Sequence, residues 1–243
     1  MMLHGIDISN WQKGLVIPEA LDFAIFKATG GTGFVDRHCD KWIQDCKRKG
    51  ILWGFYHFAG DGWTPNPENE AAFFYEYTKG YVGDGIPVLD IEDERIPDWG
   101  DYAQRFVDKY HAITNVYPWI YCSQAYLHRF NGYPITETCG LWLANYPDNK
   151  VRGLKNVPDV SINPSPWAFA AAWQFSANGA LDCWDGPLDL DVAYMDASAW
   201  HKYANPVGSI EHTQILQAPT ETADKPTWTL ENSKVRVDIT LKS

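Results

Sequence analysis

The sequence predicts an α/β protein whose main part is a barrel of eight strands that lacks some of its later helices. Eight short apolar runs recur along the 243 residues, with turn or helix signals between them. Helical periodicity separates the early runs and fades in the second half of the chain. The length fits, because barrels of alternating strands and helices often use about 200–250 residues as one domain.

The predicted strands are short apolar runs bounded by turn residues, which favours strands over longer buried helices. They are Gly5–Ser9, Phe23–Ala28, Leu52–Ala59, Val88–Glu92, Trp119–Ser123, Gly140–Asn145, Ala171–Ser176 and Leu188–Tyr194. Eight strands with helices mainly after the first four or five suggest a barrel in which the last helices are lost. We favour this closed barrel over an open sheet.

The first predicted helix runs from Asp36 to Lys49. Within it Trp42, Ile43 and Cys46 recur at helical spacing, and Gly50 is a stop signal directly after it. This pattern is typical of an amphipathic helix that buries one face.

Two further helices follow in the first half of the chain. Asn66-Pro67 fits an N-cap followed by proline at the first helical position, and predicts a helix over Glu68–Thr78. The segment from Asp101 to Thr114 places five apolar side chains on one helical face. They belong to Tyr102, Phe106, Val107, Tyr110 and Ile113.

The second half of the chain has weaker helical signals and ends in a tail. Gln124–Phe130 is predicted as one or two turns, and Pro147 to Pro166 as a long loop. We assign 1–203 to the barrel, 204–226 to a linker or draped loop, and 227–243 to a strand-rich tail that fits a hairpin. An isolated hairpin is marginally stable, so the tail packs on the barrel, pairs with another chain or opens a further domain. A monomer and a tail-mediated dimer both stay open.

Composition excludes several classes of partner. The net charge is −11, and no cluster of Lys and Arg suits nucleic acid. No stretch has the eighteen apolar residues that membrane insertion needs. The five cysteines are scattered without a CxxC spacing, which predicts reduced, mostly buried thiols and no metal site. No cofactor motif is present.

Three predicted strands share an alternation of acids with aliphatics. The segments are Ile6-Asp7-Ile8-Ser9, Leu89-Asp90-Ile91-Glu92 and Leu188-Asp189-Leu190-Asp191-Val192. Side chains at i and i+2 point to the same side of a strand. In a barrel the aliphatics would pack under the helices and the acids would point inward near the strands' C-terminal ends, where barrel enzymes place their chemistry.

Carboxylates that converge on a confined space are costly unless they serve a function. Crowding raises the pKa of one acid and leaves a neighbour ionised. A proton donor beside an anion is what glycoside hydrolysis requires. The alternative, that these acids only cap loops or pair with lysine, is disfavoured because three segments show the same pattern.

The segment Gly-Ile-Asp-Ile-Ser-Asn-Trp-Gln over 5–12 resembles the opening strand of glycoside hydrolase family 25, the lysozymes that cut between N-acetylmuramic acid and N-acetylglucosamine. Seven more family-like segments follow in order. They are Phe26-Lys27-Ala28-Thr29, Gly54-Phe55-Tyr56-His57-Phe58, Pro87-Val88-Leu89-Asp90-Ile91-Glu92, Ile120-Tyr121-Cys122-Ser123, Leu141-Trp142-Leu143-Ala144-Asn145-Tyr146, Trp173-Gln174-Phe175-Ser176 and Leu188-Asp189-Leu190-Asp191-Val192. The resemblance covers about residues 3–200 and implies an irregular TIM-like barrel of eight strands with about five helices.

The resemblance also implies the catalytic groups. By motif match, Glu92 is the general acid, and Asp90, Asp7 and Asp189 complete an acidic cluster that supports it and the positive charge developing on the sugar. Asp191 stands where the family more often has Asn, so its role stays open.

Aromatic positions of the family's groove match Tyr56, Tyr121, Trp142 and Tyr146. These rings are expected to line the groove, with core packing as the alternative. Two polar residues are separate cases. Gln174 either binds an acetamido group or satisfies backbone, and His57 is expected to make a core or supporting hydrogen bond.

The predicted function is therefore hydrolysis of the β-1,4 bond in peptidoglycan glycan strands, as in a bacteriophage endolysin. We expect a protein made in the host cytoplasm without a signal peptide, since the N-terminus lacks a basic region and an apolar core, and acting on the wall after release. Alternatives are a catalytically silent cell-wall carbohydrate-binding barrel and a chitinase-type hydrolase, although the latter expects a longer acidic motif. Retaining, inverting and substrate-assisted mechanisms stay open, and we favour the last.

Overall fold

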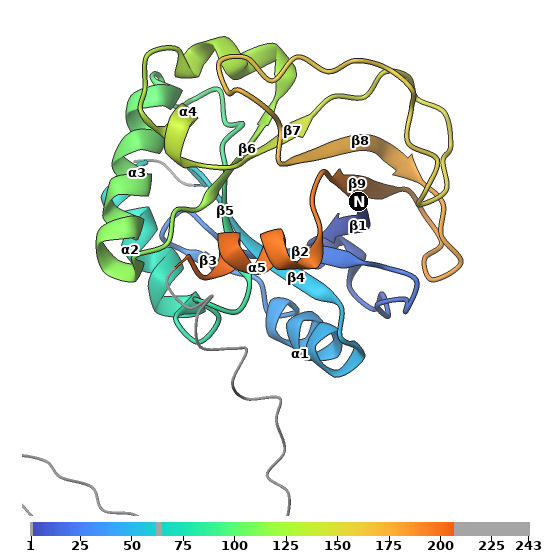
Figure 1. The fold of residues 1–243 in the computed structure, drawn as a ribbon. Coiled ribbons are helices and arrows are strands. Elements are labelled where there is room, and N and C mark those ends of the chain that lie inside the picture. The colour runs from blue at the N-terminus through green and yellow to red at the C-terminus, as the bar shows by residue number, and fades with distance from the viewer. Residues whose placement is uncertain (1, 62–64, 207–243) are drawn as a thin grey trace, which may run out of the picture. The chain divides into compact units, whose positions relative to one another are not determined.

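The computed structural model describes residues 2–61 and 65–206, so the predicted tail over 227–243 and most of the predicted linker lie outside the described residues. Eight strands form a closed barrel in the order β1-β9-β8-β7-β6-β5-β4-β2, closed by pairing of β1 with β2 (Figure 1). A ninth strand, β3, pairs only with β2. The strands are β1 Leu3–Ile8, β2 Phe23–Gly30, β3 Phe34–Val35, β4 Leu52–Phe58, β5 Ile86–Asp90, β6 Trp119–Ser123, β7 Leu141–Ala144, β8 Ala172–Gly179 and β9 Leu188–Ala193. The predicted eight-strand barrel is confirmed.

Within the eight-strand barrel, one strand is antiparallel to its neighbours. β1, β2 and β4 to β8 pair in parallel, whereas β9 is antiparallel to both β8 and β1. The segment between β8 and β9 spans only 180–187, which is too short for the crossover that a parallel pair requires. The prediction that each acidic segment ends its strand is therefore wrong for Asp189. This residue lies near the start of β9, and the reversed direction brings it to the same rim as the ends of β1 and β5.

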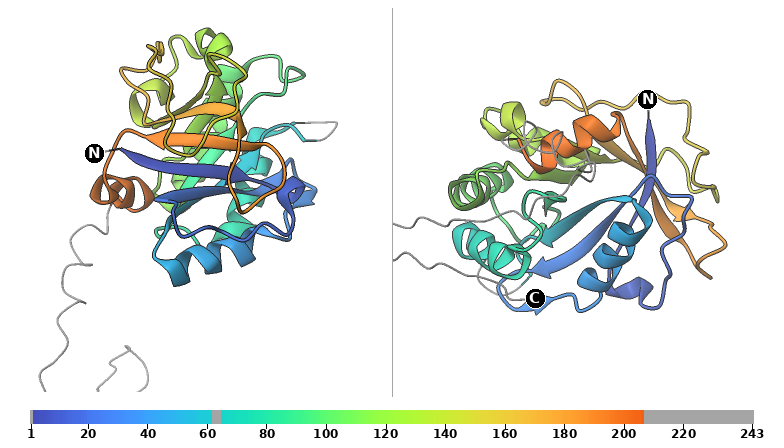
Figure 2. Two further views of the ribbon diagram at one scale, coloured as in Figure 1. Left: turned by 90° about the vertical axis from the view of Figure 1, so that its right-hand side faces the viewer. Right: turned by 60° about the horizontal axis from the view of Figure 1, so that its bottom comes forward.

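The helices lie outside the barrel and cover it unevenly. Figures 1 and 2 show α1, α2 and α3 along one side, while the long β7–β8 connection covers another side as loop. The described helices are η1 Asn10–Gln12, α1 Cys39–Lys49, α2 Pro67–Thr78, α3 Trp99–Thr114, η2 Gln124–Phe130, α4 Ile135–Thr138 and α5 Ala197–Ala204. The loss of helices in the second half is confirmed. None of these helices is long and apolar enough to cross a membrane.

Helix boundaries follow local capping. α2 begins at Pro67 after Asn66, whose side chain accepts the amide of Asn69, as predicted. α1 begins at Cys39 rather than Asp36, because the Asp36 carboxylate accepts the amides of Asn10 and His38 and so belongs to the loop before the helix.

The sheet separates two hydrophobic layers. Aliphatics of the acidic segments, including Ile6, Leu89 and Leu190, are buried in the outer layer beneath the helices. The inner layer fills the barrel and contains the large rings of Phe23, Trp119 and other inward residues. The predicted outward direction of the aliphatics is confirmed, and the acids that alternate with them point inward.

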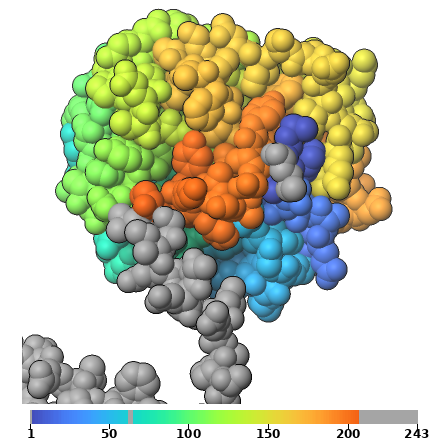
Figure 3. Space-filling model, viewed as in Figure 1, coloured from blue at the N-terminus to red at the C-terminus, as the bar shows by residue number. Residues whose placement is uncertain are grey.

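Helix α5 closes one end of the barrel and was not predicted. Its fully buried Trp200 packs with ring centroids 4.8 Å from Phe23 and 5.5 Å from Trp119. Figure 3 shows the orange atoms of α5 in the middle of this end. The groove that the acidic segments line lies at the opposite rim.

Candidate active site

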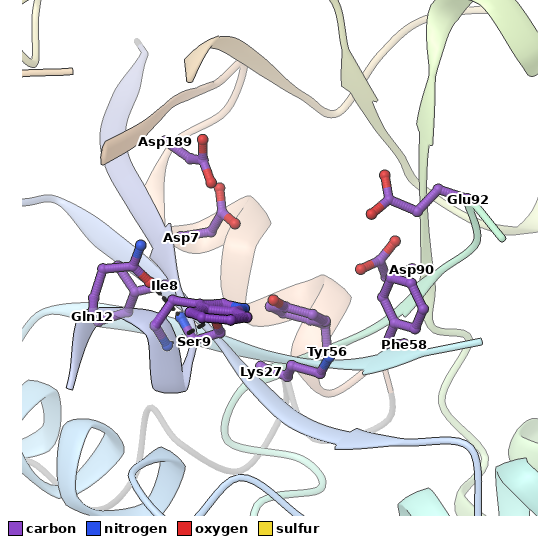
Figure 4. A pocket seen from close by; sticks show the side chains of 11 residues that line it. Asp7, Ile8, Ser9, Gln12, Lys27, Tyr56, Phe58, Asp90, Glu92 and Asp189 are labelled. Atoms are coloured by element: carbon purple, nitrogen blue, oxygen red, sulfur yellow. Dashed lines mark hydrogen bonds between the residues drawn. The ribbon is translucent and has the colours of Figure 1, made fainter. Parts of the chain in front are cut away.

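The acidic segments meet in a groove at the open rim of the barrel. Two adjoining hollows of about 280 and 100 Å³ share the side chains of Asp7, Tyr56, Asp90, Glu92 and Asp189. Figure 4 shows Asp7 and Asp189 on one side of the larger hollow and Asp90 and Glu92 on the other, with the carboxyl groups directed into the space between them. The structure thus brings together all four predicted catalytic acids.

Strand register explains how these acids converge. Asp7 on β1 lies directly opposite Asp189 on β9. Asp90 is the last residue of β5, where its neighbours across the sheet are Phe58 and Tyr121. The site is built on strands closed into a barrel, so its geometry is fixed by backbone hydrogen bonds.

Glu92 lies beyond the strand in which it was predicted. β5 ends at Asp90, and the amide of Ile91 donates to the carbonyl of Tyr121 as the last sheet contact. The Glu92 side chain is then exposed at the mouth of the groove, whereas Asp90 and Asp7 are buried. Of the four acids, Glu92 is the one most accessible to a bound substrate.

Removal from water raises the pKa of both acids on the β5 side, and repulsion from Glu92 raises that of Asp90 further. The pKa of Asp90 is well above its usual value because the carboxyl is buried and because Glu92 lies beside it. The surrounding protein raises the pKa of Glu92 as well. In both cases the positive charge of Lys27 opposes the shift.

The acids on the β1–β9 side show the same behaviour. Burial raises the pKa of Asp7, and the charges of Asp191 and Asp189 raise it further. Burial and then the charge of Glu92 raise the pKa of Asp189 to about 6. Crowding and burial in the groove therefore favour retention of protons on these carboxyls at a higher pH than on ordinary acids.

Gln174 holds the Asp7 carboxyl in place by a hydrogen bond. Its amide nitrogen donates to Asp7 Oδ2 at 2.6 Å, and its amide oxygen accepts from the hydroxyls of Tyr121 (2.7 Å) and Tyr146. The side chain is buried on the inward face of β8. These contacts are to side chains rather than to backbone and give Gln174 a supporting role, while its binding of an acetamido group stays a prediction.

The predicted groove rings occupy different depths. Tyr56, Tyr121 and Trp142 line the smaller hollow, but Tyr121 and Trp142 are buried and pack with centroids 4.5 Å apart. Tyr146 is 46% exposed beside them. Tyr146 and Tyr56 are thus the predicted rings with the freest access to a ligand. The rings of Tyr121 and Trp142 are buried and form the wall of the smaller hollow.

Trp11 and Lys27 are among the residues that line the groove and were not predicted as site residues. Trp11 is 82% exposed at the mouth of the larger hollow, and Lys27 projects into it. Both lie in segments that carried the family resemblance. Alternation along β2 was a usable signal for Lys27, because it shares the inward face with Phe23 and Ile25.

His57 does not reach the groove. It is fully buried, Nδ1 lies 2.8 Å from Thr29 Oγ1, and Nε2 lies 3.0 Å from Glu70 on α2. Glu70 also accepts the amide of Gly60 in the loop after β4. Burial lowers the pKa of His57, and Glu70 opposes that shift. The predicted supporting hydrogen bond is confirmed.

Comparison with known proteins agrees with this architecture. The family model described as glycosyl hydrolases family 25 matches residues 6–184. An N,O-diacetylmuramidase from Chalaropsis sp. is 27% identical over 212 residues, covering 77% of this chain and 96% of that protein.

Solved structures share the fold. A lysozyme from Streptomyces coelicolor superposes with a TM-score of 0.69 at 24% identity, covering 84% of this chain and 97% of its own. A family GH25 lysozyme from Aspergillus fumigatus gives a TM-score of 0.66 at 25% identity, covering 84% of this chain and all of its own.

Proposed function

This chain belongs to glycosyl hydrolase family 25 and is a glycoside hydrolase, and we propose that it cuts the β-1,4 bond between N-acetylmuramic acid and N-acetylglucosamine in peptidoglycan. The observation that carries the proposal is the exposed Glu92 in one groove with three other carboxyls, Asp90 beside it and Asp7 and Asp189 on the opposite side. The likeness to an N,O-diacetylmuramidase supports the choice of substrate.

In the proposed reaction Glu92 protonates the leaving oxygen. It is the acid with open access to the groove, and its raised pKa keeps a proton available at higher pH than an ordinary glutamate would. Negative charge on the other carboxyls, Asp7 or Asp189 across the groove and Asp90 beside Glu92, stabilises the positive charge that develops on the sugar ring.

We further propose that the substrate's own N-acetyl oxygen attacks the anomeric carbon. The Asp90 carboxyl lines both hollows and its Oδ1 has no hydrogen-bond partner among the described residues, so the carboxyl can accept the acetamide N–H and orient that group. This route retains the anomeric configuration. Proton NMR of the first product tests it, and an inverted anomer contradicts it.

Mass spectrometry of digested peptidoglycan tests the bond that is cut. Muramic acid at the new reducing ends supports the proposal, and glucosamine at those ends contradicts it. Binding of wall fragments with no new reducing ends would instead support a catalytically silent carbohydrate-binding barrel.

The place of action is proposed from the substrate. Peptidoglycan lies outside the cytoplasm, so an enzyme made there acts only after release, as expected of an endolysin. Expression in a host should lyse cells when a membrane-permeabilising protein is co-expressed and not without it. Lysis by the chain alone contradicts this proposal.

A further inference from the structure

One further carboxyl, that of Asp191, is buried in the barrel next to the groove without lining it. On β9, Asp191 occupies the inward position next to Asp189, and its partners across the sheet are Gly5 on β1 and Gln174 on β8. Gly5 has no side chain, and the carbonyl and ring of Phe23 occupy the place where its Cβ would lie. The next side chain on this face of β1 is that of Asp7, two residues further along. The carboxyls of Asp7 and Asp191 lie within hydrogen-bonding reach of each other.

Asp191 is held on one side only. It is fully buried, and its Oδ1 accepts the indole N–H of Trp142 at 2.8 Å. Its Oδ2 has no hydrogen-bond partner among the described residues. A buried carboxyl oxygen without a donor is costly, and the group within its reach is the carboxyl of Asp7.

No cation compensates this pair. None of the ion pairs in residues 2–61 and 65–206 includes Asp7, Asp189 or Asp191. Two adjacent carboxylates in a low-dielectric interior cannot both be ionised without compensation. The arrangement is stable when one proton lies between them and one negative charge remains.

We propose that Asp191 is a positioning residue that shares one proton with Asp7, so that the pair carries a single negative charge and Asp7 is held in the groove from two sides. Gln174 holds one oxygen of Asp7, and the shared proton holds the other. The inference rests on the proposed function, because it assigns Asp7 to the sugar-facing wall of that site.

Electrostatics around the pair agree with this geometry. Burial raises the pKa of both carboxyls, and the charge of Asp189 on the same strand raises both further. Two tyrosine hydroxyls lie near the pair, that of Tyr146 after β7 and that of Tyr121 on β6. Burial and the nearby acids raise the pKa of both hydroxyls. Lys27 acts on the opposite pair of acids, Asp90 and Glu92.

Infrared spectroscopy of the whole protein at pH 7 tests the shared proton without substrate. The carbonyl band of protonated carboxyl groups should lose the intensity of one group in Asp191→Asn, because the amide then donates permanently to an ionised Asp7. The exposed Asp185→Asn serves as the matched control and should leave the band intact. An undiminished band in Asp191→Asn overturns the proposal.

Activity on glycan fragments tests the positioning role. Asp191→Ala removes the contact to Asp7 and should lower kcat/KM by about tenfold or more. Asp191→Asn keeps that contact and should restore most of this loss, with an altered acid limb in the pH profile. Equal losses in the two folded variants, checked by circular dichroism, overturn the proposal. A wild-type protein that releases no reducing ends refutes the proposed function instead, and the infrared result still decides the shared proton.

Discussion

Trp11 is the most exposed large ring at the groove, and its exposure has a structural cause. It belongs to η1, which is fixed by a capping box. The Ser9 side chain accepts the backbone amide of Gln12, and the Gln12 side chain accepts the backbone amide of Ser9. A ring displayed on a fixed turn at the mouth of a sugar-binding groove is suited to stack on a pyranose face.

Trp11→Ala should therefore weaken substrate binding. We expect KM for soluble glycan fragments to rise about three- to tenfold, the effect of losing one aromatic contact of about 0.5–1.5 kcal/mol, while kcat changes little. Trp11→Phe should retain most of the affinity. An unchanged KM in Trp11→Ala contradicts the stacking role.

The charge of Lys27 opposes the rise in pKa of the two acids on the β5 side. Its charge lowers the pKa of Asp90 and Glu92, and its ammonium group lies 4.5 Å from the ring centroid of Phe58. Lys27→Met removes the charge, so the pKa of Glu92 rises and the acid stays protonated to higher pH.

The alkaline limb of the kcat–pH profile should accordingly move to higher pH in Lys27→Met, and added salt should reduce the difference. Lys13→Met, on the exposed surface, is the control. A limb that stays in place or moves to lower pH contradicts the assignment of Glu92 as the titrating acid.

Asp189 lowers stability at neutral pH. Its pKa of about 6 in the folded protein lies above the ordinary value of 3.8, so between these two values the folded state binds more protons than the unfolded state. The free energy of unfolding from this group therefore falls as pH rises through that window.

Asp189→Asn should be more stable than wild type, by about 1–2 kcal/mol at pH 7 after allowance for solvent screening. The difference should vanish near pH 4, grow up to about pH 6 and then remain constant. Urea unfolding at several pH values measures it. A variant less stable than wild type at pH 7 would show that this carboxylate is stabilised in the fold.

At the scale of elements, α5 is the structural end-cap of the barrel. Asp196 caps it by accepting the amide of Ala199, and Trp200 fills the inner layer at the end opposite the groove. The helix was not predicted because Ala197–Ala204 is only 8 residues long and begins just after the last strand ends at Ala193.

Trp200→Ala should lower the free energy of unfolding by about 3–5 kcal/mol, because it leaves a large cavity in the inner layer. Activity per folded molecule should stay near that of wild type, since the groove lies at the other end. Urea unfolding and active-site titration separate the two effects. A loss of less than about 1 kcal/mol contradicts the end-cap role.

Sequence periodicity predicted the elements that alternate strongly and missed those set by tertiary contacts. The inward direction of Asp7 and Asp90 follows from alternation within one strand. The end of β5 does not, because it depends on the last backbone contact across the sheet, in which the amide of Ile91 donates to the carbonyl of Tyr121. The two-residue strand β3 depends wholly on pairing with β2.

At the scale of the whole molecule, the closed barrel and four acids of the groove were predictable, whereas contacts between distant strands were not. Asp191 illustrates the limit. Its pairing with Asp7 depends on the antiparallel direction of β9 and on the register that sets Gly5 opposite it. Neither can be read from a single strand. Trp11 was missed because its exposure depends on the turn after β1.

The proposed hydrolysis depends on the one solvent-accessible acid, Glu92, and on the more deeply placed carboxyls around it. The most direct test compares Glu92→Gln with Glu94→Gln, a nearby glutamate that does not line the groove. Release of reducing ends from purified cell walls should fall at least about 100-fold in Glu92→Gln, with unchanged unfolding, and stay near wild type in Glu94→Gln. Retained activity in a folded Glu92→Gln protein would contradict the assignment of Glu92 as the proton donor.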